Sequence, residues 1–178
     1  LLDRYKGELP FAILGLGRLG LGEFDLASDA DLIFIASPEL SRDDLVCCTR
    51  LAEDTIAMLS SYTRDGTVFA VDTRLRPQGR EGELVVTSDA LVQYAQEGAQ
   101  VWEAMTYLKV VPVAGDTQLG EETVSRLLAA TLGRFGSYSG LQAELREMRR
   151  RLEREVLVPP SNTKTAPGGY FDVDFAVS

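Results

Sequence analysis

The chain has 178 residues, 45% of them hydrophobic, and a formal net charge of −9, so it can build one or at most two domains around a real core. The negative charge is a poor match for a nucleic-acid backbone and argues against a nucleic acid as substrate. The sequence contains no histidine, which excludes Ser-His-Asp, Cys-His and histidine-ligated zinc chemistry and leaves carboxylates, metal ions and cationic side chains for any catalysis.

The first third of the chain is organised around two apolar runs, Phe11–Leu14 and Leu32–Ile35, which predict two strands. Residues 1–10 before them resemble the end of a helix and a turn, so we expect the chain to be a piece of a longer protein. The runs are joined by a glycine-punctuated turn with glycines at 15, 17, 20 and 22. Because glycine has no β-carbon, backbone N–H groups in such a turn can approach phosphate oxygens.

Two carboxylates, Asp29 and Asp31, directly precede the second predicted strand. At positions i and i+2 of a strand they project from the same side. Carboxylates held this close repel each other unless a proton or cation lies between them. Carboxylate oxygens suit Mg²⁺, which is commonly held by one or two carboxylates and substrate phosphates. The pattern therefore predicts a metal-nucleotide site, with a solvated strand end as the alternative, since Asp-x-Asp is common by chance.

The glycines also match the spacing Gly15-x-Gly17-x-x-Gly20 of a dinucleotide-binding turn. That motif needs a helix immediately after it, whereas Gly22 and Ser28 predict a loop. The sequence also lacks Gly-Lys-Ser and Gly-Lys-Thr, which excludes a P-loop. We therefore expect neither a Rossmann fold nor a P-loop.

Gly17, followed by eleven residues and then Asp29-Ala30-Asp31 and an apolar strand, resembles the active-site signature of the DNA polymerase β-type nucleotidyltransferases. The longer pattern Leu-Gly-Arg-Leu-Gly…Ser-Asp-Ala-Asp-Leu is similar to one branch, the glutamine-synthetase adenylyltransferases. The resemblance implies an α+β fold with a mixed sheet flanked by helices and followed by C-terminal helices.

A helix is predicted from Ser41, its N-cap, to about Tyr62, with Asp44 in a capping-box position. Apolar residues recur through it at helical spacing. The helix contains the adjacent Cys47 and Cys48, which lack metal-ligand spacing. We expect them to be buried or half-buried reduced thiols.

The segment Val68–Arg76 alternates like a strand and would carry Asp72, Arg74 and Arg76 on one face. At ~3.3 Å per residue, the span from Asp72 to Arg76 would be about 13 Å, roughly an extended triphosphate with its metal. One interpretation makes Asp72 a third metal ligand and the arginines phosphate contacts, and it gains support from the two earlier segments that predict the same site. The alternative is an edge strand whose Asp and Arg side chains pair in solvent, where such a pair contributes ~0–1 kcal/mol.

Four further elements are expected before residue 116: a strand at 84–87, a helix from a Ser88 or Asp89 cap to Glu97, a helix at 99–108 with Trp102 in the core, and an extended segment at 110–114. Through this region the resemblance extends. Over residues 11–116 the order and spacing of the motifs are similar to those of the adenylyltransferase family. The motifs in this region are Val-Asp-Thr-Arg-Leu-Arg-Pro-x-Gly-x-x-Gly-x-Leu-Val-x-Thr-Ser, then Trp-Glu, Lys and Val-Ala-Gly-Asp.

By this resemblance the protein would transfer AMP from ATP to a tyrosine of glutamine synthetase by a two-metal mechanism. Two Mg²⁺ ions would be held by Asp29 and Asp31, with Asp72 on the ion that activates the hydroxyl. The implied nucleotide-binding residues are Gly15, Gly17, Arg18, Ser28, Arg74 and Arg76. Arg18 stands where the family has lysine, a change that keeps the charge but need not be neutral at a phosphate.

The C-terminal part predicts helices at 118–132 and 141–157, separated by a loop at 133–140. Lys164, Gly168-Gly169 and Asp172-Val173-Asp174-Phe175 resemble a family motif in which glutamate occupies the place of Asp174. That motif opens a helical domain in the family. We therefore expect a catalytic core at 1–116, and at 117–178 a helical extension with the start of a truncated helical domain.

Two alternatives to adenylylation stay open. Long members of the family resemble two copies of this domain, one adenylylating and one removing AMP by phosphorolysis; the Asp72–Pro77 segment is slightly more like the adenylylating copy. The second alternative is a non-catalytic module that binds nucleotide or a partner. Arg18 and Asp174 favour it because they depart from the family pattern. The cluster of three carboxylates opposes it, because an abandoned site has no physical reason to keep a costly acidic cluster.

The resemblance implies ATP and glutamine synthetase as partners, and a nitrogen-signalling regulatory protein that would act through further domains. No stretch approaches the ~20 apolar residues of a membrane span, and no signal peptide is visible. We expect a soluble, cytoplasmic protein without a nucleic-acid or membrane partner.

Overall fold

The computed structural model describes residues 9–23, 28–64, 66–67, 69–155 and 169. Its centre is a five-stranded mixed sheet in the order β5-β2-β1-β7, with β6 also paired to β2. The sheet strands are β1 (Phe11–Gly15), β2 (Ala30–Ala36), β5 (Val71–Asp72), β6 (Val85–Thr87) and β7 (Val111–Gly115). A separate hairpin consists of β3 (Tyr62–Thr63) and β4 (Gly66–Thr67).

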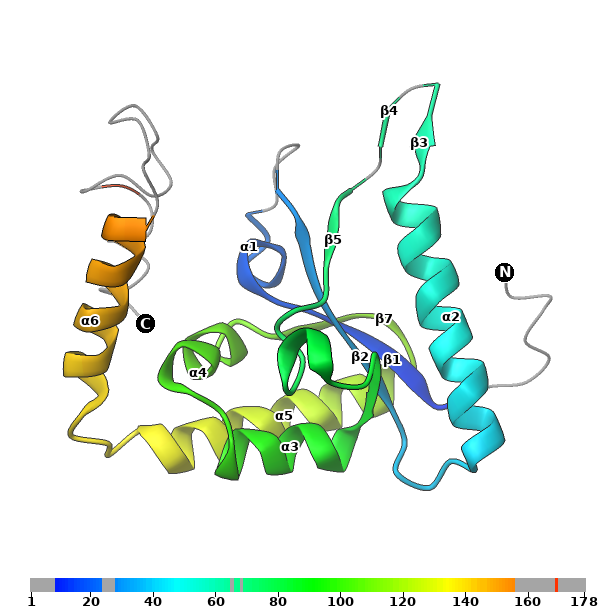
Figure 1. Cartoon of the computed structure of the whole chain (residues 1–178). Coiled ribbons are helices and arrows are strands. Elements are labelled where there is room, and N and C mark those ends of the chain that lie inside the picture. The colour runs from blue at the N-terminus through cyan, green and yellow to red at the C-terminus, as the bar shows by residue number, and fades with distance from the viewer. Residues whose placement is uncertain (1–8, 24–27, 65, 68, 156–168, 170–178) are drawn as a thin grey trace.

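Six α-helices are described: α1 (Gly17–Gly20), α2 (Arg42–Ser60), α3 (Ser88–Glu97), α4 (Val101–Tyr107), α5 (Thr117–Phe135) and α6 (Leu141–Glu155). A 3₁₀ turn at Gly79–Glu81 lies in the loop between β5 and β6. Helices lie on both sides of the sheet, and α6 stands apart from it at the far end of α5 (Figure 1). The α+β class with C-terminal helices is confirmed.

Strand β2 is the organising strand of the sheet. It runs antiparallel to β1, with Ile13 opposite Phe34, and parallel to both β5 and β6. β5 pairs with the start of β2 and β6 with its end, so the two short strands share one edge of β2. The register places Asp31 beside Asp72 and Ile35 beside Val86.

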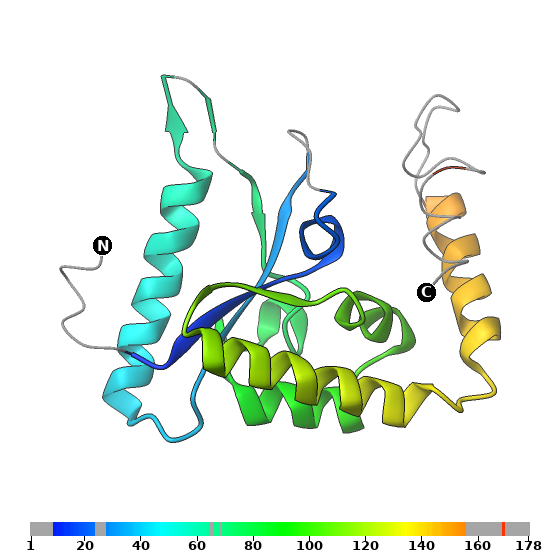
Figure 2. The same ribbon diagram turned by 180° about the vertical axis from the view of Figure 1, so that it is seen from behind.

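The two faces of the sheet form two buried clusters because side chains alternate along β2. Ile33 and Ile35 point into the larger cluster, which α3, α4 and α5 cover. Leu32 and Phe34 point into the other, where Cys48 of α2 packs. Figure 2 shows the sheet from behind, between α2 and the pair α3 and α5. Residues 29 and 31 have the same parity as Ile33, which puts Asp31 on the side of the larger cluster.

The helix caps agree in part with the sequence. Ser41 caps α2 as predicted, since its Oγ accepts from the Asp44 N–H at 3.2 Å. The predicted cap of α3 at Ser88 or Asp89 is wrong: Thr87 accepts from the Ala90 N–H. Thr87 is also the last residue of β6, so the extended backbone that a cap requires ends there, and the helix begins at Ser88, earlier than we expected.

The first of the two C-terminal helices extends beyond its predicted end. α5 continues through Phe135, into the predicted loop, because Phe135 packs in the larger cluster. Leu127 of α5 is fully buried there, so α5 shares the core of the sheet; a functional boundary at residue 116 stays a prediction. In α6, Arg149 is buried although it belongs to the charged face of the predicted helix.

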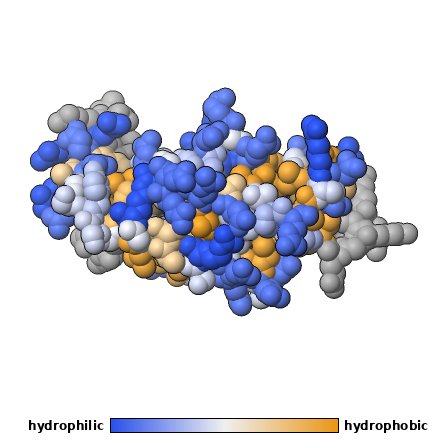
Figure 3. All heavy atoms as spheres, turned by 90° about the horizontal axis from the view of Figure 1, so that it is seen from below, coloured by the Kyte–Doolittle hydropathy of each residue, from blue (hydrophilic) through white to orange (hydrophobic). Residues whose placement is uncertain are grey.

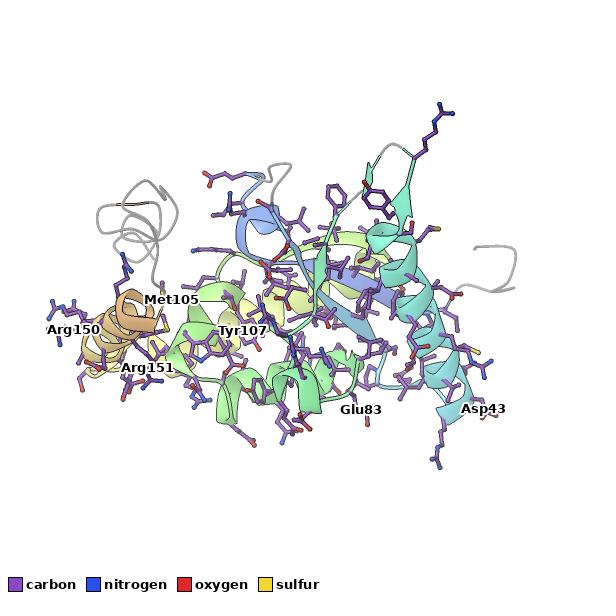
Figure 4. The ribbon with its side chains drawn as sticks, turned by 45° about the horizontal axis from the view of Figure 1, so that its top comes forward. Asp43, Glu83, Met105, Tyr107, Arg150 and Arg151 are labelled. Carbon is purple, nitrogen blue, oxygen red and sulfur yellow. The ribbon has the colours of Figure 1, made fainter. Side chains whose placement is uncertain are left out.

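The outer surface is mixed. Seen from below, the molecule has apolar residues interspersed among hydrophilic ones (Figure 3). Arg150 and Arg151 project from α6 away from the sheet (Figure 4). In the part of the chain that the structure describes, no helix has the length and apolar character to cross a membrane.

The thiols are placed as expected. Cys47 is half-buried and Cys48 buried, and both are free. Burial raises the pKa of the Cys48 thiol to about 11, so it stays protonated and unreactive at neutral pH.

Candidate functional site

Three carboxylates gather at the start of β2. Asp31 of β2 and Asp72 of β5 are direct neighbours in register across parallel strands, so their side chains project from the same face of the sheet. Asp29 is exposed and lies just before β2, which begins at Ala30. Asp29 and Asp31 each raise the pKa of Arg74, so one guanidinium lies within electrostatic reach of all three carboxylates.

Arg74 binds Asp72 with both its backbone and its side chain. The Arg74 N–H donates to Asp72 Oδ1 at 2.8 Å, and Nε lies 2.9 and 2.7 Å from the two carboxylate oxygens. Nη2 also pairs with Oδ2. Hydrogen bonds from Arg74 hold the pKa of Asp72 below its ordinary value, and the same bonds raise the pKa of Arg74. Because the Arg74 side chain is 60% exposed, solvent screens the pair, and we expect it to contribute about 0–1 kcal/mol.

The glycine turn touches the carboxylates at Gly17. Its φ is +57°, and a β-carbon there would lie 2.7 Å from Asp31 Oδ2. The Leu16 N–H donates to the Asp31 carbonyl at 3.0 Å. A residue with a side chain would therefore suffer both backbone strain and a clash with the carboxylate.

The other predicted phosphate-binding residues flank this contact. Gly15 ends β1, where a β-carbon would meet Val113 at 2.9 Å. Arg18 lies on the single turn of α1, half-buried. Ser28 is buried directly before Asp29. The short α1 lies where we expected a loop, and at four residues it does not form the long helix of a dinucleotide-binding turn.

The prediction of a strand across Val68–Arg76 is wrong: Val68 lies outside the described residues, and the strand is confined to Val71–Asp72. One reason is that β6 pairs with the later part of β2 and leaves β5 only its start. The other is the hydrogen bond from the Arg74 N–H to the Asp72 side chain, which folds the backbone into a turn. The expected 13 Å ladder of charges on one strand face is therefore absent from this segment.

Arg76 is placed quite differently from Arg74. It is buried, and its guanidinium donates to four oxygens: Thr73 O at 2.7 Å, Thr73 Oγ1 at 2.8 Å, and Arg80 O and Gly82 O at 3.2 Å each. These contacts close the loop that follows Asp72. Arg76, predicted to bind phosphate, thus holds the loop from inside in this structure.

Three residues that were not predicted as site residues support the same loop from α3 and α4. Glu103 is buried and accepts from the Tyr94 hydroxyl at 2.9 and 3.1 Å and from the Gln100 N–H at 2.8 Å. Tyr107 of α4 (Figure 4) is fully buried, and its hydroxyl donates to the Leu75 carbonyl at 3.4 Å. Burial raises the pKa of Tyr107.

A sequence pattern could have indicated this support. Glu103 and Tyr107 are four residues apart and so share one helix face. Their neighbour Trp102, predicted to be in the core, is only half-buried and donates from its indole N–H to Gln100. The polar residue beside Trp102 is thus more buried than the aromatic one.

The donor chemistry of the site suits magnesium. Asp31 and Asp72 provide the pair of carboxylates with which Mg²⁺ is commonly held alongside substrate phosphates. Among the described residues, however, no group of three or more Asp, Glu or Cys side chains is assembled for a metal ion. Arg74 engages both oxygens of Asp72, and Asp29 precedes the strand on an exposed segment.

Comparison with known proteins identifies the family of the chain. The family model for glutamate-ammonia ligase adenylyltransferase matches residues 2–126. The chain belongs to this family. The match includes all three carboxylates, the glycine turn and the Arg74–Gly82 loop, and it confirms the resemblance drawn from the motifs.

Curated relatives are named bifunctional glutamine synthetase adenylyltransferase/adenylyl-removing enzymes. Those of Streptomyces avermitilis and Pseudomonas aeruginosa are each 37% identical to the chain, over 93% and 98% of its length. The Mycobacterium tuberculosis relative is 35% identical over 98% of the chain. The matches cover 17%, 19% and 18% of these relatives, so the chain spans less than one fifth of their length.

Proposed function

We propose that the protein transfers AMP from ATP to a tyrosine hydroxyl of glutamine synthetase. The observation that carries the proposal is the pairing of Asp31 with Asp72 directly beside Gly17. This arrangement combines a carboxylate pair that suits magnesium with a backbone turn that a phosphate can approach. The relatives are named as enzymes of glutamine synthetase, and these names support glutamine synthetase as the acceptor.

In this proposal Asp29, Asp31 and Asp72 would hold the Mg²⁺ ions. Bound magnesium would neutralise charge on the triphosphate and lower the pKa of the attacking hydroxyl. The backbone at Gly15 and Gly17, with Arg18 and Ser28, would bind phosphate oxygens. The tyrosine oxygen would form a bond to the α-phosphorus while the bond to pyrophosphate breaks.

Positive charge near the leaving group would assist this step. Arg74 carries an exposed guanidinium that can contact the phosphates of a bound nucleotide. Stabilisation of the negative charge that develops in the transition state contributes strongly to the rate of such reactions. The contacts of the buried Arg76, Glu103 and Tyr107 and of the half-buried Tyr94 would keep the loop after Asp72 in place.

Removal of AMP from adenylylated glutamine synthetase by phosphorolysis is the second candidate. Its support is the adenylyl-removing activity in the names of the relatives. The same carboxylates would serve, because phosphorolysis also transfers an adenylyl group between oxygen atoms at a metal-dependent site.

The deciding experiment runs both reactions side by side. The protein is given Mg²⁺, ATP labelled in its α-phosphate and unmodified glutamine synthetase, or labelled adenylylated glutamine synthetase and inorganic phosphate. Label incorporation supports transfer, and release of labelled ADP supports removal. Asp31→Asn should lower the rate of whichever reaction is seen by roughly two to three orders of magnitude.

A binding measurement distinguishes a third outcome, a protein that binds nucleotide but catalyses neither reaction. Calorimetric titration with the α,β-methylene analogue of ATP, with and without Mg²⁺, detects a nucleotide site that does no chemistry. Magnesium-dependent binding without either reaction would leave a non-catalytic binding module and overturn the proposed transfer.

A further inference from the structure

The carboxylates at the start of β2 already have a cation beside them. Arg74 engages both oxygens of Asp72 from its guanidinium, and a separate hydrogen bond runs from its backbone N–H to Oδ1 at 2.8 Å. Asp31 lies next to Asp72 in register. The Asp72 oxygens that face the guanidinium are the same atoms that a metal ion would need.

We propose that Arg74 is the internal counter-ion of the carboxylates and changes partner when Mg²⁺ and ATP bind. It releases Asp72 to the metal ion and turns to the triphosphate. The inference rests on the metal site of the proposed function, and it adds a competition between an arginine and a metal ion for one carboxylate.

The contacts of Arg74 make such an exchange feasible. Its side chain is 60% exposed, whereas that of Asp72 is 15% exposed, so the guanidinium can swing into solvent while the carboxylate stays in place. The backbone N–H bond to Oδ1 does not depend on the guanidinium, and it keeps Asp72 oriented after release. The moving part is therefore one side chain.

Arg76 shows what a fixed arginine looks like in the same loop. It is buried and donates to carbonyl oxygens of Thr73, Arg80 and Gly82. Its release would break the hydrogen bonds of a buried guanidinium, which is costly. The loop can thus stay closed around Arg76 while Arg74 alone changes partner.

The competition predicts two effects of opposite sign. Without its guanidinium, Asp72 is open to the metal ion, so Mg²⁺ alone should bind more tightly. With nucleotide present, the contact from Arg74 to the triphosphate is lost, so the ATP analogue should bind more weakly. A merely structural role of Arg74 would weaken both.

The test compares Arg74→Gln with Arg80→Gln as the matched control. Arg80 also lowers the pKa of Asp72 through its charge, and its side chain is exposed. Both variants lose one positive charge near the same carboxylate, but only the first opens the Asp72 oxygens. The first readout is calorimetric titration with Mg²⁺ alone, and the second is titration with the α,β-methylene analogue of ATP at saturating Mg²⁺.

For Arg74→Gln we expect Mg²⁺ alone to bind roughly two- to fivefold more tightly than to the wild type. The ATP analogue should bind it roughly tenfold more weakly. For Arg80→Gln both affinities should stay within about twofold of the wild type, as for a screened, more distant charge. Thermal unfolding with and without Mg²⁺ checks the first result, because the Arg74→Gln protein should gain more in melting temperature from the ion.

The inference is overturned if Arg74→Gln binds Mg²⁺ no more tightly than the wild type, or if Arg80→Gln shows the same gain. A wild type that binds no Mg²⁺ overturns it as well. Adenylyl transfer is assayed on the wild type in parallel. Loss of transfer with the affinity differences intact would overturn the proposed function alone, whereas transfer with unchanged affinities would overturn the exchange alone.

Discussion

The two ends of β2 differ sharply in what they carry. The end at Phe34–Ala36 pairs with β6, and its side chains are fully buried between α2 and the helices of the opposite face. The end at Ala30–Asp31 pairs with β5 and presents carboxylates beside the glycine turn. In the proposed function this strand supplies stability at one end and chemistry at the other, which we call its reactive end, since charged groups stay solvated only where the helical cover stops.

Substitution at each end should separate the two roles. Asp31→Asn should lower adenylyl transfer by roughly two to three orders of magnitude, because a metal-binding charge is lost. It should hardly change the free energy of unfolding. Phe34→Ala should instead lower the free energy of unfolding by about 3–5 kcal/mol, because it leaves a cavity in the core.

Initial rates and urea unfolding on the same preparations check this comparison. The Phe34→Ala protein should retain transfer activity at temperatures where it is still folded. If Asp31→Asn instead unfolds the protein and keeps its residual rate per folded molecule, the division between the two ends is wrong.

The glycine turn offers a sharper contrast within the reactive end. Gly17→Ala places a β-carbon 2.7 Å from Asp31 Oδ2 at a φ of +57°. Gly22→Ala meets a similar strain, φ +69°, but no atom lies within 4 Å of its β-carbon. Both should cost about 1 kcal/mol in the free energy of unfolding from backbone strain.

Only Gly17→Ala should also weaken Mg²⁺ binding and transfer, by roughly tenfold or more, because it displaces the Asp31 carboxylate. Metal titration and rates on the two variants measure the difference. Equal losses of activity in both would mean that strain, and not the approach to Asp31, decides the effect.

The loop after Asp72 connects the reactive end to the helices. Arg76→Ala should lower the free energy of unfolding by about 1–3 kcal/mol, because it removes a buried guanidinium whose hydrogen bonds close the loop. Arg74→Gln removes an equally charged side chain two residues away but should cost less than about 1 kcal/mol. Urea unfolding of both proteins gives the comparison, and a larger loss for Arg74→Gln would reverse the roles assigned to the two arginines.

The sequence predicts best those elements that repeat a pattern over many residues. The strands at Phe11–Gly15 and Ala30–Ala36 and the long helices α2 and α5 follow from apolar periodicity. Motif spacing also brings together the residues at the start of β2: Asp31, Asp72 and Gly17 are neighbours in the structure.

The sequence fails where one tertiary contact overrides the local pattern. The alternating pattern predicts Arg74 and Arg76 on one strand face. Because the backbone turns after Asp72, the Arg74 side chain is exposed and the Arg76 side chain is buried in the loop. The pairing of β6 with β2, which shortens β5, depends on a segment more than ten residues away. The spacing of Glu103 and Tyr107 indicates a shared helix face, but it does not identify Tyr94, the hydrogen-bond partner of Glu103, because Tyr94 lies on another helix.

The smallest expected effect is on the stability of the protein at low pH. Hydrogen bonds from Arg74 hold the pKa of Asp72 below its ordinary value of 3.8, so the folded protein takes up a proton there less readily than the unfolded chain. The resulting stabilisation is fully present above the unfolded pKa and is lost as the pH falls through the folded pKa. For an exposed pair it amounts to at most about 1 kcal/mol.

Between pH 5 and pH 2, by the ordinary titration range of a carboxyl group, the free energy of unfolding should therefore fall less steeply for Asp72→Asn than for the wild type. Arg74→Gln should follow the Asn variant, because Asp72 then loses the partner that lowers its pKa. Urea unfolding across this pH range measures the slopes. Three parallel curves would mean that the Asp72–Arg74 pair does not persist in solution, and the reactive end of β2 would then hold its carboxylates apart without an internal cation.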